Sequence, residues 1–179
     1  MAYAGQEIHN PRTGQRMVFL ETDRREVLRI DSINPPVEGE PEPEHVHPHQ
    51  ESGAELISGS LRFRVDGRER SLGPGDRITV PPNTRHNFWN DANEEAHSIQ
   101  WFRPSLEIAA FFETFFALAQ QGRLNEKGLP SVLQIAAMSS SFSDEVRVTR
   151  PPWPVQRVVL GALAPIARRR GYRARYELP

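Results

Sequence analysis

The sequence predicts a mainly β domain followed by about three helices. Up to Arg103, short segments rich in β-branched and aromatic residues alternate with turn residues, a pattern typical of an antiparallel barrel or sandwich. After Pro104, apolar residues recur at helical spacing instead. The formal charge changes sign at the same point, since residues 1–103 hold 12 basic and 17 acidic side chains and residues 104–179 hold 10 and 6. We therefore predict a β-barrel over residues 1–103 and an α-helical extension over residues 104–179 that packs on the barrel or on a partner.

The predicted strands are short, and glycine, proline or aspartate separates them. The strongest turn signal is Asp66-Gly67, a dipeptide that favours the tight turn of a β-hairpin. A loop rich in proline and glutamate over residues 34–44 leads into a histidine-rich segment that also reads as a strand. The other predicted strands cover residues 16–21, 26–33, 54–58, 61–65, 68–72, 77–80, 85–89 and 97–102.

The extension is predicted to contain three helices, over residues 108–121, 129–138 and 155–169. The first is apolar on more than one face, so the barrel or a second chain must cover it. The third joins apolar residues to an arginine-rich end. It can pack on the protein with a solvated tail, lie on an anionic membrane surface, or bind nucleic acid. The overall acidity of the chain argues against the last of these, so no nucleic-acid partner is expected.

The composition excludes several kinds of chemistry. The chain has no cysteine, which excludes disulfides, thiolate metal ligands and a cysteine nucleophile. Residues 1–10 are polar and lack the apolar core of a signal peptide. No apolar run approaches the roughly 18 residues needed to span a bilayer. We therefore expect a cytoplasmic protein.

Histidines form the most distinctive pattern in the sequence. Three of the six, His45, His47 and His49, fall within five residues, and His86 follows a proline-containing turn at residues 81–84. Side chains alternate along a strand, so His45 and His47 point to the same face. Two such imidazoles and a third from a facing strand would form a site for one divalent transition metal ion, with iron, zinc, nickel or manganese as candidates. The alternative is that these histidines face solvent or form hydrogen bonds within the core.

The spacing of these residues resembles that of the cupins, small β-barrel proteins with two sequence motifs. The motifs span residues 39–90 here, and the spacing of the strands extends the resemblance to most of residues 7–103. The resemblance implies a cupin-type double-stranded β-helix, or jelly-roll, barrel. The matching residues are Gly39, His45, His47 and Gly59 in the first motif and Gly75, Pro81, His86 and Asn90 in the second, with Asn83 in the place of a second glycine.

In cupins, the two histidines and a glutamate of the first motif and the histidine of the second bind one metal ion. Carried over by position, His45, His47 and His86 are the expected ligands. This chain has Ser52 at the position of the motif glutamate. Some cupin dioxygenases bind iron through three histidines, so loss of the glutamate does not by itself abolish metal binding. It removes one negative charge and would make the ion a stronger Lewis acid.

The fourth ligand position departs from the motif. The glutamate should fall at position 52, where this chain has Ser52, and Glu51 lies one residue earlier. Either a β-bulge turns Glu51 inward, where it would act as a ligand or a catalytic base, or three histidines hold the ion and water fills the remaining positions. His49 shares strand parity with His47 and is expected to be a spare ligand or a residue of the rim.

Two functions from different classes follow from the resemblance. The first is a metal-binding cupin that acts on a small molecule inside the barrel, with a non-haem iron dioxygenase-like or an isomerase activity. The second is a non-catalytic binding or sensor protein whose basic helical tail contacts a membrane surface or a partner protein. The fold alone does not determine which of these two functions the protein has, because one fold can host many functions. A homodimer is expected, because cupins often dimerise through barrel faces.

Overall fold

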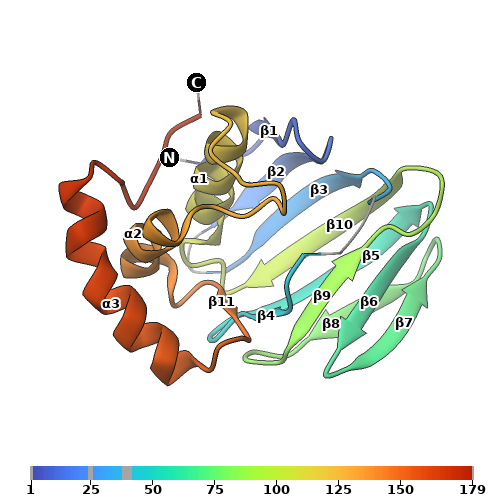
Figure 1. Ribbon diagram of the computed structural model, residues 1–179. Coiled ribbons are helices and arrows are strands. Elements are labelled where there is room, and N and C mark those ends of the chain that lie inside the picture. Colours follow the sequence, from blue (N-terminus) through green and yellow to red (C-terminus); the bar gives the residue numbers. More distant parts are fainter. Residues whose placement is uncertain (1, 24–25, 38–41, 179) are drawn as a thin grey trace.

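The computed structural model describes residues 2–23, 26–37 and 42–178 of the chain. Two antiparallel sheets face each other, and three helices lie together at one side of them (Figure 1). The strand order is β1-β2-β3-β10-β5-β8 in the first sheet and β11-β4-β9-β6-β7 in the second. The prediction of a mainly β protein with three C-terminal helices is confirmed. The elements are β1 (Glu7–His9), β2 (Arg16–Thr22), β3 (Leu28–Asn34), β4 (His45–Val46), β5 (Glu51–Ser58), β6 (Leu61–Val65), β7 (Arg68–Leu72), β8 (Arg77–Val80), β9 (His86–Trp89), β10 (Ala96–Arg103), α1 (Ile108–Gln120), α2 (Val132–Phe142), β11 (Arg147–Val148) and α3 (Trp153–Arg169).

Most strands lie where the sequence predicts them. β6, β7 and β8 have the predicted bounds, and Asp66 and Gly67 both have positive φ, as the tight hairpin turn between β6 and β7 requires. β5 begins earlier than predicted, at Glu51. The sequence does not predict β1 or β11, because two or three residues are too few to show an alternating pattern.

The boundaries of two helices follow from their first residues. α2 begins at Val132 rather than at residue 129, because the Ser131 side chain accepts a hydrogen bond from the backbone N–H of Gln134 and so caps the helix. α3 begins at Trp153, and Pro154 lies in its first turn, where a missing N–H costs no helical hydrogen bond.

The backbone conformation explains the residue type at two motif positions, Gly59 and Asn83. Gly59 has a φ of 78°, and a Cβ atom there would lie 2.6 Å from the carbonyl oxygen of Glu95. Asn83 also has positive φ, at 59°, which fits its place in the position of a motif glycine. Gly39, the first residue of the first motif, lies outside the described residues.

Helix α1 shares one hydrophobic core with the first sheet. Ile108 and Phe116 of the helix pack in the same buried cluster as Phe19, Leu28 and Ile30 of β2 and β3. Figure 1 shows α1 lying against this end of the first sheet. The division of the chain into domains at residue 103 stays a prediction.

Truncation of Phe116 tests how far the fold depends on α1. Phe116 is fully buried, so Phe116→Ala leaves a cavity between helix and sheet, and we expect a loss of about 3–5 kcal/mol in the free energy of unfolding. Chemical denaturation measures this loss. Val132→Ala, at an exposed position on α2, is the control and should change stability by less than about 0.5 kcal/mol. Equal stability of the two variants would contradict the shared core.

The extension also supplies a strand to the second sheet. β11 pairs antiparallel with β4, with Arg147 opposite Val46 and Val148 opposite His45. β4 in turn pairs with β9 through His45 and His86. The segment after α2 therefore borders the histidine-bearing strand directly, an arrangement that hydrophobic periodicity alone does not reveal.

Candidate metal centre

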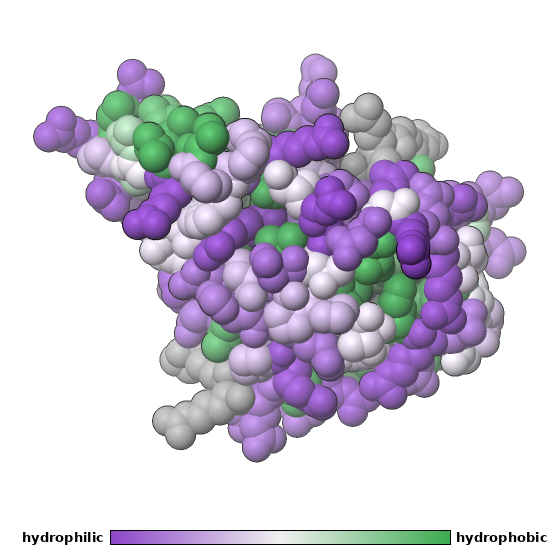
Figure 2. All heavy atoms as spheres, turned by 90° about the horizontal axis from the view of Figure 1, so that it is seen from below, coloured by the Kyte–Doolittle hydropathy of each residue, from purple (hydrophilic) through white to green (hydrophobic). Residues whose placement is uncertain are grey.

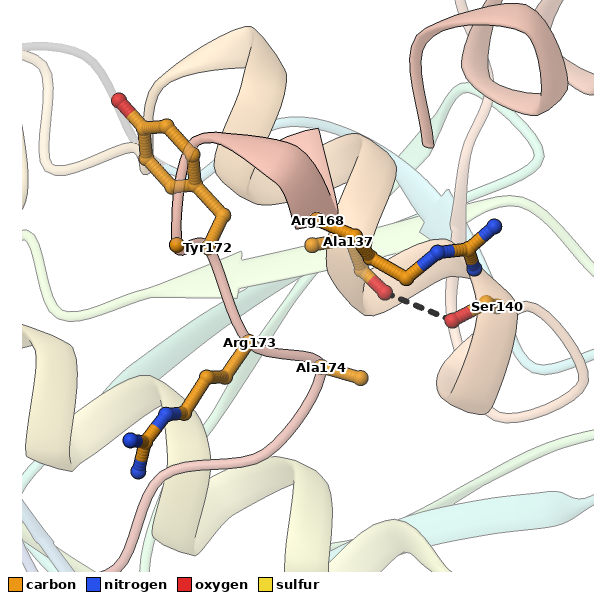
Figure 3. A pocket seen from close by; sticks show the side chains of 7 residues that line it. Ala137, Ser140, Arg168, Tyr172, Arg173 and Ala174 are labelled. Carbon is orange, nitrogen blue, oxygen red and sulfur yellow. Dashed lines mark hydrogen bonds between the residues drawn. The ribbon is translucent and has the colours of Figure 1, made fainter. Parts of the chain in front are cut away.

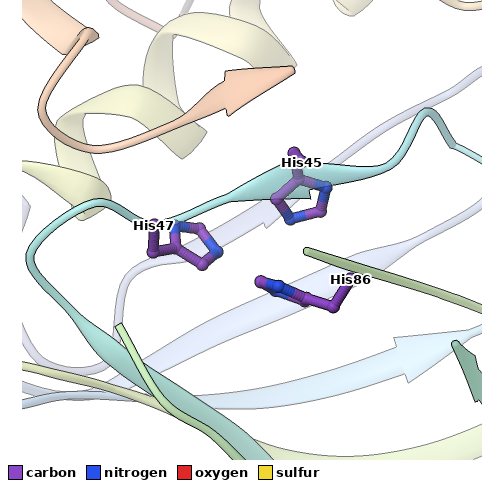
Figure 4. Close-up of side chains that lie close together, drawn as sticks. All are labelled: His45, His47 and His86. Atoms are coloured by element: carbon purple, nitrogen blue, oxygen red, sulfur yellow. The ribbon is translucent and has the colours of Figure 1, made fainter. Parts of the chain in front are cut away.

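Three of the predicted ligands converge on one point of the barrel. His45 lies opposite His86 in the β4–β9 pair, and His47 follows β4 on the same segment. Their ring centroids are 5.1 Å apart for His45 and His47, 4.6 Å for His45 and His86, and 5.2 Å for His47 and His86. One ring nitrogen of each histidine lies within 4.8 Å of the others. Figure 4 shows the three imidazoles facing one another from two strands.

Backbone carbonyl groups fix the orientation of all three rings. The Nδ1 atom of His45 lies 3.1 Å from the carbonyl oxygen of Pro43, that of His47 2.7 Å from Glu145, and that of His86 2.9 Å from Thr84. A carbonyl oxygen only accepts hydrogen bonds, so each Nδ1 carries the proton. Each neutral ring then has an unprotonated Nε2, the arrangement that outer hydrogen bonds impose on metal-binding histidines. The Nδ1–H groups of His45, His47 and His86 thus donate to the backbone carbonyl oxygens of Pro43, Glu145 and Thr84, respectively.

The electrostatics of the group favour neutral imidazoles. Burial and, to a smaller extent, the neighbouring His86 lower the pKa of His47 to about 3. Burial and the two other histidines hold the pKa of His45 well below its ordinary value, and burial also lowers the pKa of His86. Neutral rings are the form that binds metal ions. The residues present therefore fit a divalent transition metal ion bound through three nitrogen atoms.

Glu51 and Ser52, the two candidates for the fourth ligand position, lie on opposite faces of β5. Ser52 is buried and faces the barrel interior, whereas Glu51 lies on the opposite face of β5. Pairing with β10 is continuous here, with Glu51 opposite Arg103 and Ser52 opposite Phe102. The bulge that would turn Glu51 inward is thus absent, and this expectation is corrected. Among the described carboxylates, none joins the three histidines within ligand distance.

His49 does not join the group either. Its side chain is 61% exposed and its Nε2 lies 3.8 Å from a carboxylate oxygen of Asp144. The strand parity that suggested a spare ligand fails because β4 ends at Val46, and regular alternation does not continue through Pro48.

Two buried glutamines, Gln50 and Gln100, were not singled out in the sequence. The Nε2 of Gln50 donates to the carbonyl oxygens of Pro104 and Ser105, and its Oε1 is buried without a partner among the described residues. Gln100 is only 5% exposed, and its Nε2 likewise has no partner in the described part of the chain. Alternation along β10 places Gln100 on the same face as Phe102. This alternation is the sequence signal that could have identified Gln100 as an inward-facing residue.

Aromatic side chains border the histidines on one side. The ring of Phe102 lies 5.1 Å from that of His47, and Phe112 of α1 lies 5.6 Å from Phe102. An apolar border excludes water and lowers the local dielectric constant, which strengthens the interactions of any polar group inside it. The extension thus contributes to the site twice, through Phe112 and through the carbonyl group of Glu145.

Comparison with known proteins agrees with the observed fold. Residues 36–102 match the sequence model of the family described as the cupin domain. The chain contains a cupin domain. An oxidoreductase from Arthrobotrys oligospora is 25% identical to it over 123 residues, a match that covers 64% of this chain and 47% of that protein. The matched part of the chain thus spans about half the length of this curated relative.

Solved structures also resemble this chain. KdgF from Halomonas sp. aligns with a TM-score of 0.51 and 16% identity, over 58% of this chain and 93% of that chain. The Cnp3 cupin domain of Schizosaccharomyces pombe aligns with a TM-score of 0.46 and 12% identity, over 50% and 64% of the two chains. At such identities the likeness to KdgF supports the fold alone. Among the helices of the described ranges, none has both the length and the apolar character needed to cross a membrane.

Proposed function

We propose that this cupin binds one divalent transition metal ion through His45, His47 and His86 and oxidises a small molecule inside the barrel. The observation that carries the proposal is the set of three carbonyl-oriented imidazoles with their free nitrogen atoms close together. When bound, such an ion would polarise a substrate oxygen or activate dioxygen. Iron is the preferred candidate, because three neutral ligands leave several coordination positions open.

The protein's own side chains supply positioning and shielding. Phe102 and Phe112 exclude water from one side of the histidines. Ser52 and Gln100 are inward-facing polar residues on β5 and β10, and the unpartnered Nε2 of Gln100 can donate a hydrogen bond to a substrate oxygen. An unpaired buried amide is costly to keep, so a bound ligand that accepts this hydrogen bond would gain from it.

The preference for oxidation over isomerisation rests on two supports. The relative from Arthrobotrys oligospora is named an oxidoreductase, although the match covers 47% of its length. The motif glutamate is replaced by Ser52, which leaves a ligand set resembling that of three-histidine cupin dioxygenases. The alternative function is that of a non-catalytic sensor, and a measurement of oxygen uptake separates the two.

Oxygen uptake by the Fe(II)-loaded protein tests the proposed activity. We expect at least one compound in a panel of small hydroxylated and enolisable carbonyl compounds to raise uptake above the substrate-free rate. The His47→Ala variant should show no such increase. A protein that binds iron and a panel compound saturably, but neither consumes oxygen nor changes the compound, would contradict the oxidase proposal and favour the sensor.

Removal of the Gln100 amide tests its role in substrate positioning. Gln100→Leu should keep its metal content and fold, while the KM for a panel compound that raises oxygen uptake increases about 3- to 10-fold, the effect of one lost hydrogen bond. The stability of the protein should stay the same or rise, because the variant removes an unpaired buried amide. A loss of stability with an unchanged KM would show that Gln100 is structural.

A further inference from the structure

Helix α3 is held to the protein by one face. Gln156, Ala164 and Ala167 are its buried residues, and α3 packs on α2. The Gln156 side chain donates hydrogen bonds to the carbonyl oxygens of Val148 and Pro151, which anchors the start of the helix beside β11. The opposite face of α3 is directed away from the protein.

This outward face is apolar, the reverse of an ordinary surface helix. Val155, Val158, Val159 and Ile166 are 49%, 72%, 47% and 44% exposed. With Ala162, which is also exposed, they recur at spacings of three and four residues and therefore form one stripe along the helix. We call these five residues the α3 stripe. Figure 2 shows hydrophobic side chains gathered over α3 at the upper left, with hydrophilic ones around them.

Arginines border the α3 stripe, and no acidic residue does. At about 100° per residue, Arg169 projects within the stripe and Arg170 beside it at its C-terminal end, whereas Arg157 and Arg168 lie about 80–100° from its nearest edge. Residues 150–175 hold seven arginines and neither aspartate nor glutamate. This charge is complementary to an anionic surface. It opposes the pairing of two α3 stripes across a twofold axis, which would bring the arginines of both copies into one interface.

A cavity next to the end of α3 adds two more cationic contacts. It has a volume of about 470 Å³, and its lining includes Ser140, Arg168, Tyr172 and Arg173. Figure 3 shows the side chains of Arg168 and Arg173 extending in different directions, while the Ser140 hydroxyl donates a hydrogen bond to the carbonyl oxygen of Ala137, 2.8 Å away. Within the described part of the chain, neither Arg168 nor Arg173 forms an ion pair, so both guanidinium groups are available to phosphate oxygens.

We propose that α3 docks on an anionic lipid surface. The α3 stripe enters the boundary between headgroups and acyl chains, and the bordering arginines bind headgroup phosphates, as in helices that lie in the plane of a membrane interface. The cavity beside Arg168 and Arg173 receives one lipid headgroup. The candidate metal ligands lie on or next to β4 and β9, so variants in the α3 stripe leave all three of them in place.

Vesicle co-sedimentation of the full chain tests this proposal. We expect the protein to sediment with vesicles of phosphatidylcholine mixed with phosphatidylserine and to remain in solution with phosphatidylcholine alone, with less binding at high salt. The double variant Val158→Glu/Val159→Glu should weaken binding by at least about tenfold. The triple variant Arg168→Gln/Arg169→Gln/Arg170→Gln should weaken it by about two orders of magnitude.

Matched controls lie elsewhere on the molecule. Val132→Glu replaces an exposed valine of α2, and Arg70→Gln removes a half-exposed arginine of β7, so neither should change vesicle binding. Unchanged metal content in all variants would keep this test separate from that of the proposed function. Absence of binding to the phosphatidylserine vesicles would overturn the proposal. So would a dimer that Val158→Glu/Val159→Glu dissociates in the absence of lipid binding, or binding of free inorganic phosphate without binding to vesicles.

Discussion

Substitution of His47 by alanine is expected to abolish high-affinity metal binding. The variant loses one of three candidate ligands, and with it the ring that the carbonyl group of Glu145 orients. Loss of an outer hydrogen-bond partner alone costs about 10- to 100-fold in metal affinity, and loss of the ligand itself should exceed that range. Competition of the purified protein against a chelator of known affinity measures the change for Zn²⁺ or Fe²⁺.

His49→Ala is the control for this substitution. His49 lies two residues further along the same segment, but its exposed ring faces Asp144 rather than the other histidines. We expect its metal affinity to stay within about twofold of the wild type, because no ligand or outer hydrogen bond is lost. Equal losses in the two variants would show that the affinity arises from the histidine-rich segment in general and not from the three converging rings.

The metal-free protein is expected to lose stability as the pH falls below 6.5. Burial lowers the pKa of His47 from 6.5 to about 3 in the folded chain, whereas the unfolded chain binds a proton at the ordinary value. Between these values the unfolded state holds more protons, so the free energy of unfolding falls with pH by about 1.4 kcal/mol per unit for this one group. The lowered pKa values of His45 and His86 act in the same direction.

A single variant isolates the contribution of His47. Burial raises the pKa of Glu145 to about 7, which opposes the histidines because the folded chain then holds an extra proton between about 4.5 and 7. This opposing effect is common to wild type and His47→Gln and cancels in their difference. From pH 6.5 to 4.5, urea denaturation should show that the wild type loses about 2–3 kcal/mol more than His47→Gln. Parallel pH profiles would contradict a buried, neutral His47.

The sequence was sufficient for the barrel and for the three candidate ligands. The Asp66-Gly67 turn set the register of β6 and β7, and alternation along the histidine segment correctly paired His45 with His47. His86 could be added because its position matches the histidine of the second cupin motif, and the structure places it opposite His45. These signals are local or follow from short-range turn chemistry, which is why they can be read without coordinates.

The remaining features depend on long-range pairing. The carbonyl oxygen of Glu145 accepts a hydrogen bond from the ring of His47, 98 residues earlier in the chain, and no periodicity connects the two positions. The short pairing of β11 with β4 brings them together. Similarly, the unpartnered amide of Gln100 is visible only once the neighbours of β10 are known. The outward face of Glu51 follows from uninterrupted pairing of β5 with β10, whereas the sequence left a bulge open.

The measurement that tests the central claim most directly is the metal content of the protein by elemental mass spectrometry. The protein is purified without a chelator or a histidine tag, beside the double variant His45→Ala/His47→Ala. We predict close to one equivalent of a transition metal ion per chain in the wild type and none in the double variant, since the three histidines supply every candidate ligand found among the described residues. A wild-type protein that holds no transition metal, even after reconstitution with iron, zinc, nickel and manganese, would contradict the account.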